Sequence, residues 1–144
     1  MRSTFFLIPL VALCVVGCNK STDVVGKWKV DPAFVKANEN AEPKGFMTGF
    51  SSTFWYDLKA DKTFTGAMTE GTWALNGETL TITTTKVAGQ DVEKLTGKKG
   101  GTLMTGTLSN GGKTLTLMLP SDVPQAQLPA ALKSGIKMAK EETK

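Results

Sequence analysis

Residues 71–85, GTWALNGETLTITTT, constrain the fold more than any other stretch, because they have the pattern of a β-hairpin. Asn76 and Gly77 both tolerate the positive φ that a tight two-residue turn requires, so we expect the turn there. Counting outward from that turn predicts Trp73 opposite Leu80. Because side chains alternate between the faces of a strand, one face is apolar and the other is rich in threonine. The apolar set is Trp73, Leu75, Leu80 and Ile82, and the other set is Ala74, Thr79, Thr81 and Thr83.

The same pattern recurs before and after this hairpin. Residues 58–65 predict a hairpin with a three-residue loop at 60–62, and residues 102–119 predict one with a four-residue loop at 109–112. The predicted partners are Leu58 with Phe64 and Tyr56 with Gly66 in the first, and Gly106 with Leu115 and Met104 with Leu117 in the second. Each of these registers keeps the apolar side chains on one face.

The remaining segments predict one more strand and a few short helices. Residues 24–30 alternate from Gly26 onward, and Asp31-Pro32 has the residues of a helix start, with an acceptor at the N-cap and proline at the first position. Phe46, Met47 and Phe50 have helical spacing. Residues 87–101 predict a long connection with a weak strand near 92–95, and residues 129–139 a marginal helix, because Gly135 lies in its middle.

These elements predict a mainly β protein. Seven strands in sequential hairpins favour an antiparallel up-and-down meander, and closure into a barrel removes the exposed edges of such a sheet. We expect the barrel domain to span residues 24–119, with one or two short helices after the first strand. Residues 120–144 are expected to form a C-terminal tail with the marginal helix.

The N-terminus has the pattern of a targeting segment. Arg2 precedes the apolar run 5–16, which is short for a membrane span. The run ends in Val-Val-Gly-Cys18, which resembles the bacterial lipobox; the resemblance implies a signal peptide at 1–17, an acylated Cys18 and a tether at 18–23. A plain secretory signal and an N-terminal membrane anchor are the alternatives. Asn19 after the cysteine favours the outer membrane by the sorting rule of enteric bacteria, so we expect a lipid-anchored protein of the bacterial cell envelope.

The residue inventory excludes most catalytic chemistry. The sequence has no histidine, and the part after residue 17 has no arginine and no cysteine apart from Cys18. Imidazole bases, thiol nucleophiles and Cys/His zinc sites are therefore excluded, and we expect no enzyme activity, no cofactor and no metal. Interspersed charges without arginine argue against nucleic acid as a partner. The remaining candidates are carboxylates and thioethers. Asp57, Asp61, Glu70 and Glu78 could in principle form a glycosidase-like pair, but Asp61 and Glu78 lie in or beside predicted turns, where polar residues are expected anyway. Met68 and Met104 are expected in the core.

Several short motifs resemble the small bacterial lipocalin-like lipoproteins. The segment Gly26-Lys27-Trp28 is similar to the Gly-x-Trp signature of lipocalins. Phe54 with the Leu58-x-x-Asp61-x-x-Phe64 pattern, and Gly71-Thr72-Trp73 with Leu80-Thr81-Ile82, follow in the expected order. The resemblance covers residues 24–119 and implies a β-barrel without enzymatic activity. The chain is shorter than true lipocalins and has an insertion between its first two strands.

Five aromatic residues are the candidate ligand site: Trp28, Phe54, Tyr56, Phe64 and Trp73. In a closed barrel they point inward, where they either line a cavity for a small apolar ligand or simply fill the interior. If they fill it, the alternative function is a protein-interaction or inhibitor module with an envelope protein as partner. Its contacts would come from Trp55, residues 87–101 and the C-terminal tail.

Overall fold

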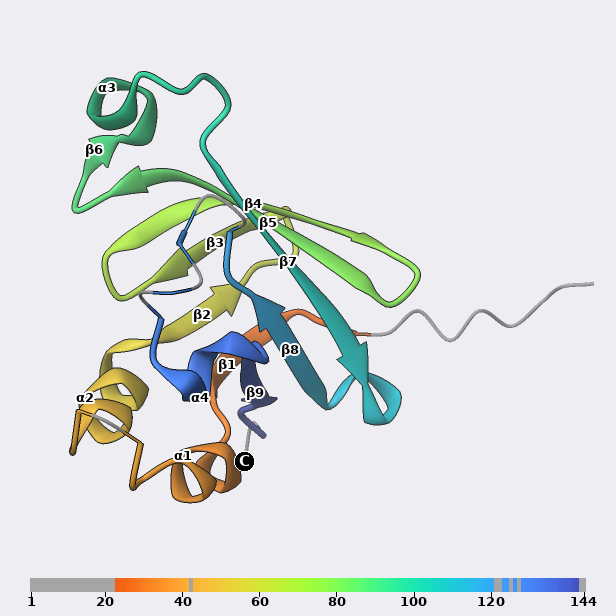
Figure 1. Ribbon diagram of the computed structural model, residues 1–144. Helices are drawn as coiled ribbons and strands as arrows, with labels where there is room; N and C mark the ends of the chain where they lie inside the picture. The colour runs from red at the N-terminus through yellow and green to blue at the C-terminus, as the bar shows by residue number, and fades with distance from the viewer. Residues whose placement is uncertain (1–22, 42, 121–122, 125, 127, 143–144) are drawn as a thin grey trace, which may run out of the picture.

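A computed structural model describes residues 23–41, 43–120, 123–124, 126 and 128–142, and Figure 1 shows its ribbon. Cys18 and the predicted signal peptide lie outside these residues. The described elements in chain order are β1 (Gly26–Val30), α1 (Pro32–Ala37), α2 (Phe46–Thr53), β2 (Trp55–Leu58), β3 (Thr63–Gly66), β4 (Thr69–Asn76), β5 (Thr79–Val87), β6 (Gln90–Asp91), α3 (Val92–Thr96), β7 (Thr102–Ser109), the 3₁₀ turn η1 (Asn110–Gly112), β8 (Thr114–Met118), α4 (Ala130–Lys133) and β9 (Ile136–Lys140).

Eight of the strands form a closed antiparallel barrel. The hydrogen-bonded order is β4-β3-β2-β1-β9-β8-β7-β5, and the β4–β5 pairing closes the ring (Figure 1). The short strand β6 pairs with β5 and lies outside the ring. Consecutive ring strands are neighbours in space, so the predicted up-and-down barrel is confirmed.

The strand that completes the barrel comes from the C-terminal tail. Helix α4 ends at Lys133, Gly135 adopts φ +91°, and the chain then extends into β9. Strand β9 pairs with β8 on one side and with β1 on the other. The predicted helix over 129–139 is therefore wrong beyond residue 133, and the barrel does not end at residue 119. A left-handed glycine stops a helix, and the alternation of Ile136 and Met138 with lysines suits a strand.

The predicted register of the hairpin over residues 58–65 is confirmed, and the registers of the other two hairpins are shifted. Leu58 pairs with Phe64, as predicted. Trp73, however, pairs with Ile82, because Gly77 and Glu78 form the turn. Only the first of these two has a positive φ (+60°), which is the sign pattern of a type II′ turn and not of type I′.

The β7–β8 hairpin shows the same kind of shift. Leu108 pairs with Leu115, and Gly106 with Leu117, around a loop at 110–113 that uses the positive φ of Asn110. A change of two positions moves a residue's partner along the strand but keeps the residue on its face. The predicted apolar face is therefore correct although the predicted partners are not.

The segment 92–95 is helical and not a strand. Val92 starts α3 and is buried, whereas the rest of the helix is exposed. Gly97 ends α3 in the left-handed conformation with φ +69°, a common helix stop. The predicted helix starts after β1 are confirmed: Asp31 caps α1 by accepting a hydrogen bond from the Ala33 N–H at 2.8 Å, and α2 begins at Phe46.

The core lies inside the barrel and under α1, α2 and α4. Its buried members form one cluster to which every ring strand contributes. Met104 is 8% exposed, as predicted for a core residue, but the expectation for Met68 is wrong because its exposed fraction is 65%. Met68 lies in the two-residue connection between β3 and β4, beyond the region where strand alternation applies.

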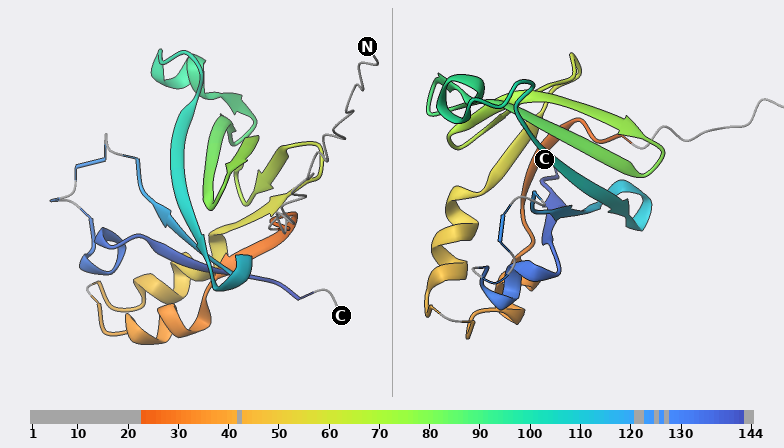
Figure 2. Two further views of the ribbon diagram at one scale, coloured as in Figure 1. Left: turned by 90° about the vertical axis from the view of Figure 1, so that its right-hand side faces the viewer. Right: turned by 45° about the horizontal axis from the view of Figure 1, so that its top comes forward.

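The two ends of the barrel differ in the length of their connections. One end, which we name the tight-turn pole, holds the start of β1, the connections 59–62, 77–78 and 110–113, and the end of β9. The other end, the long-loop pole, holds α1, α2, α3, α4 and the connection 67–68. In Figure 1 the tips of the β4–β5 and β7–β8 hairpins lie on the right, and α1, α2 and α3 lie on the left. The left panel of Figure 2 turns the right-hand side of Figure 1, with these hairpin tips, toward the viewer.

Candidate functional site

Four of the five predicted ligand-site residues lie inside the barrel, and the fifth, Phe54, packs against them at its mouth. Trp28, Tyr56, Phe64 and Trp73 are buried, and Phe54 is partly buried against the same cluster. The two indole N–H groups are satisfied by the protein itself: Trp28 Nε1 donates to the Val24 carbonyl at 2.9 Å, and Trp73 Nε1 to the Lys59 carbonyl at 3.0 Å. These side chains therefore pack against one another and fill the interior around them. That they contact a ligand stays a prediction.

Tyr56 places the one phenol of the sequence in this interior. Its side chain is 4% exposed, and its O–H donates to the Met104 sulfur at 3.7 Å. Burial raises the pKa of Tyr56 to about 12, because the phenolate would lose its hydration. Tyr56 is thus neutral over the physiological pH range and acts as an apolar ring with a single donor.

A continuous row of aromatic rings connects the surface helix α2 with this interior. Neighbouring ring centroids are 5.6 Å apart for Phe46 and Phe50, 4.7 Å for Phe50 and Phe54, 5.3 Å for Phe54 and Tyr56, and 5.2 Å for Tyr56 and Phe64. The first two pairs are stacked and the last two are edge-to-face. Both arrangements are favourable, so the row fixes the rings at the mouth of the barrel.

An apolar hollow of about 410 Å³ opens where this row meets the long-loop pole. We name it the rim groove, and its lining residues are Thr53, Phe54, Trp55, Tyr56, Ala67, Met68 and Thr69. It lies where the start of β2 faces the β3–β4 connection, beyond the last β2–β3 pair, Tyr56 with Gly66. Two of the five predicted residues, Phe54 and Tyr56, line it, whereas Trp28, Phe64 and Trp73 do not.

Trp55 forms part of the wall of the rim groove and has a charged neighbour, Lys27. It is partly buried on the outer face of β2, opposite Lys29 in the register with β1. The Lys27 ammonium lies 4.9 Å from the centroid of the Trp55 ring, a cation–π contact. The rim groove thus joins aromatic walls to a cation on its outer side.

Sequence reasoning missed the wall that the β3–β4 connection supplies. Ala67, Met68 and Thr69 face the aromatic wall from across the rim groove. The available signal was the segment Gly66-Ala67-Met68-Thr69 between two threonine-containing strands, whose central residues have to form the turn. An exposed methionine there is a soft, adaptable apolar contact.

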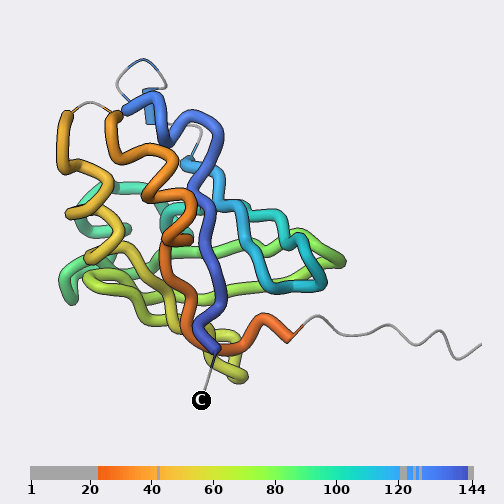
Figure 3. Tube along the Cα trace, turned by 90° about the horizontal axis from the view of Figure 1, so that it is seen from below, coloured from red at the N-terminus to blue at the C-terminus, as the bar shows by residue number. Residues whose placement is uncertain are grey.

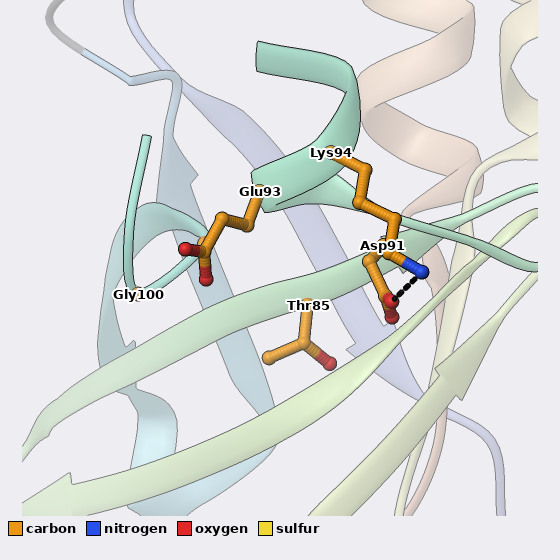
Figure 4. A pocket seen from close by; sticks show the side chains of 6 residues that line it. Thr85, Asp91, Glu93, Lys94 and Gly100 are labelled. Atoms are coloured by element: carbon orange, nitrogen blue, oxygen red, sulfur yellow. Dashed lines mark ion pairs between the residues drawn. The ribbon is translucent and has the colours of Figure 1, made fainter. Parts of the chain in front are cut away.

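Two further hollows are lined mainly by polar and charged residues and by glycines. One of about 430 Å³ lies under α3 and is lined by Thr85, Asp91, Glu93, Lys94, Gly100 and Gly101. The Lys94 ammonium lies 3.4 Å from the Asp91 carboxylate there, and Figure 4 marks this ion pair with a dashed line. The other, of about 510 Å³, lies at the tight-turn pole between Asp23, the connection 110–113 and residues 140–142.

Two of the four candidate carboxylates, Asp61 and Glu70, have structural partners. Asp61 accepts hydrogen bonds from the Thr63 hydroxyl at 2.6 Å and the Thr63 N–H at 2.9 Å, which lower the pKa of its carboxyl. Glu70 lies 3.9 Å from the Lys86 ammonium. Within the described residues, histidine, cysteine and carboxylate side chains nowhere gather in a group of three or more that could hold a metal ion.

Comparison with known proteins gave no relatives. Neither the family models, nor the curated proteins, nor the solved structures contain a match to this chain. In the described part of the chain, no helix is both long enough and apolar enough to cross a bilayer.

Proposed function

We propose that this chain is a non-enzymatic bacterial envelope protein, anchored by lipid at Cys18, that binds a small apolar molecule in the rim groove. The observation that carries the binding proposal is the apolar hollow between the Phe54–Tyr56 wall and Met68 at the mouth of the barrel. A lipocalin-like role, implied by the sequence motifs, agrees with this proposal. The proposed binding site differs from the one expected from the sequence, because it lies at the rim of the barrel and not at its centre.

The packing of the interior favours the rim. A ligand at the centre would have to displace Trp28 or Phe64, whose exposed fractions are 0% and 1%. Interiors packed in this way open only at a free-energy cost, because each displaced ring loses its contacts. The rim groove is already open, and its volume is within the range typical of small-molecule sites.

The residues around the rim groove indicate the class of ligand. Aromatic rings and a thioether contact an apolar or aromatic body well. The Lys27 ammonium over Trp55 adds attraction for an anionic group at the outer end of such a body. We therefore infer an amphipathic ligand with an apolar part and an acidic part.

Fluorescent probes test this proposal. N-phenyl-1-naphthylamine is apolar and neutral, and 1-anilinonaphthalene-8-sulfonate has a similar body with an acidic group. Met68→Ser should weaken binding of both probes about fivefold, since one apolar contact worth about 1 kcal/mol is lost. Met118→Ser is the matched control, because Met118 is also exposed (45%) but lies on β8. Equal affinities in the two variants would contradict the rim groove as the site.

The acidic part of the ligand has its own test. Lys27→Gln removes the cation beside Trp55 and keeps a side chain of similar length. We expect it to weaken binding of the sulfonate probe and to leave the neutral probe unchanged. A loss for both probes would indicate that Lys27 only supports the position of Trp55.

A second candidate function is the interaction module, and the outer face of the barrel favours it. Leu103 and Met118 are 58% and 45% exposed, and they lie among the outward threonines of β5, β7 and β8. Contiguous patches of exposed apolar side chains mark protein contacts, and these two side chains would form the centre of such a patch. Leu103→Ser should then reduce capture of an envelope protein by the full-length chain and leave probe binding unchanged.

A further inference from the structure

We propose that the tight-turn pole faces the membrane, so that the rim groove opens away from the bilayer. This inference rests on the proposed anchor at Cys18 and adds the surface that meets the lipid. The tight-turn pole then contacts the layer of lipid headgroups, and the ligand of the rim groove arrives from the aqueous side.

The first observation is the place where the described chain begins. Asp23 precedes β1 at the tight-turn pole, and the Lys140 ammonium holds it there through its side-chain Oδ2 and its main-chain carbonyl, both at 3.0 Å. Val24 is 2% exposed, and its carbonyl accepts the Trp28 indole hydrogen bond. The chain therefore leaves the barrel at a fixed point beside the end of β9.

The second observation is the short distance along the chain from this point to the anchor. Cys18 is five residues before Asp23, and five extended residues span at most about 17 Å. The acylated sulfur lies at the membrane, so the tight-turn pole has to stay within this reach. The segment between Cys18 and Asp23 is too short to let the barrel turn over freely.

The third observation is the height of the barrel. Strand β5 has nine residues and runs from the tight-turn pole to the long-loop pole. At about 3.3 Å per residue and a tilt of about 40°, it separates the poles by roughly 20 Å. The rim groove, at the long-loop pole, is thus directed away from the lipid by the full height of the barrel. Figure 3, seen from below, shows the hairpin tips and the helices at opposite ends of the molecule.

Charge does not oppose this orientation. The described residues of the tight-turn pole carry lysines and carboxylates in similar number: Lys59, Lys62, Lys113 and Lys140 with Asp23, Asp61, Glu78, Glu141 and Glu142. Such a surface is neither strongly attracted to nor repelled by anionic headgroups. The point of attachment therefore sets the orientation, and added salt should not change it.

Site-specific quenching tests the orientation in the full-length, lipidated protein. The chain after Cys18 has no other cysteine, so Glu78→Cys and Glu39→Cys each give one site for a bimane label. Both glutamates are exposed, the first at the tight-turn pole and the second after α1 at the long-loop pole. The proteins are reconstituted into phosphatidylethanolamine and phosphatidylglycerol vesicles that contain a lipid with a headgroup nitroxide.

We expect the label at residue 78 to be quenched at least twofold more than the label at residue 39, in low salt and in about 0.5 M NaCl. Flotation of the vesicles measures anchoring separately. If the protein floats with the vesicles but the two labels are quenched equally, or the label at 39 more, the orientation is wrong and the anchor stands. If the protein does not float, the proposed anchor fails and this inference fails with it.

Discussion

Met138→Ala tests the closure of the barrel by its C-terminal strand. Met138 is 0% exposed and lies on β9 between Leu115 of β8 and Val30 of β1. The substitution removes the thioether side chain beyond its Cβ and leaves a cavity in a filled interior. We therefore expect a loss of about 2–5 kcal/mol in the free energy of unfolding, the range for buried methionine-to-alanine changes.

Urea unfolding of the chain from Asn19 onward, followed by tryptophan fluorescence, measures this loss. With a urea dependence of about 1–3 kcal/mol per molar, the midpoint should fall by roughly 1–2 M. Lys137→Ala is the control, because Lys137 is the exposed neighbour on the same strand and its loss should change stability by less than about 0.5 kcal/mol.

The refuting result is an equally small effect of both substitutions. The helix that the sequence favours over 129–139 has a stripe at 128, 132, 136 and 139, which leaves Met138 off its apolar side. In that arrangement Met138→Ala would cost little. A small effect would therefore mean that the C-terminal segment does not complete the barrel.

Three further predictions concern the backbone, the buried phenol and the anchor. Gly71→Ala should lower stability by about 1–3 kcal/mol in the same urea assay, because the new Cβ would meet the Thr83 carbonyl oxygen and lie 2.9 Å from the Phe64 ring; Gly49→Ala, with open space around it, should not. Near-ultraviolet titration of Tyr56 should give a pKa near 12, and since the unfolded phenol ionises near 10, about 2–3 kcal/mol of stability present below pH 10 should be lost as the pH rises to 12; a midpoint near 10 would contradict its burial. Cys18→Ser should move the protein from the membrane fraction to the soluble fraction, and retention in the membrane would rule out the lipid anchor.

The barrel could be predicted from sequence because alternation fixes the face of each residue. Trp73 and Leu80 are buried on the predicted side even though their partners differ by two positions. Two adjacent turn positions have similar composition, so the sequence does not distinguish a turn at 76–77 from one at 77–78. The φ values of Gly77 and Glu78, which decide between them, depend on the twist of the folded strands.

The closing strand β9 is a segment whose local sequence pattern fits two structures. Ile136, Met138 and two lysines alternate over only five residues, and the same residues also fit one side of a helix. What selects the strand is the pair of open edges on β1 and β8, which a single segment can satisfy at once. That choice depends on tertiary structure and could not be predicted from the segment alone.

The sequence predicts only one wall of the rim groove, because the other wall depends on tertiary structure. Phe54 and Tyr56 were identified from their alternation, and both line the rim groove. Alternation continued through the β3–β4 turn predicts Met68 in the core, but alternation does not apply within a turn. Which aromatic residues meet the surface depends on how α2 covers the mouth of the barrel, and this is not encoded in the spacing of the strands.

The three tryptophans give the most direct test of a filled barrel with a ligand site at its rim. Their indole N–H signals are separate reporters in nitrogen–proton NMR spectra: the buried Trp28 and Trp73 donate to backbone carbonyls, and Trp55 lines the rim groove. On titration with 1-anilinonaphthalene-8-sulfonate, we predict that the Trp55 signal shifts and the other two stay in place. A shift of Trp28 or Trp73 with no change in Trp55 would show binding inside the barrel and contradict this account.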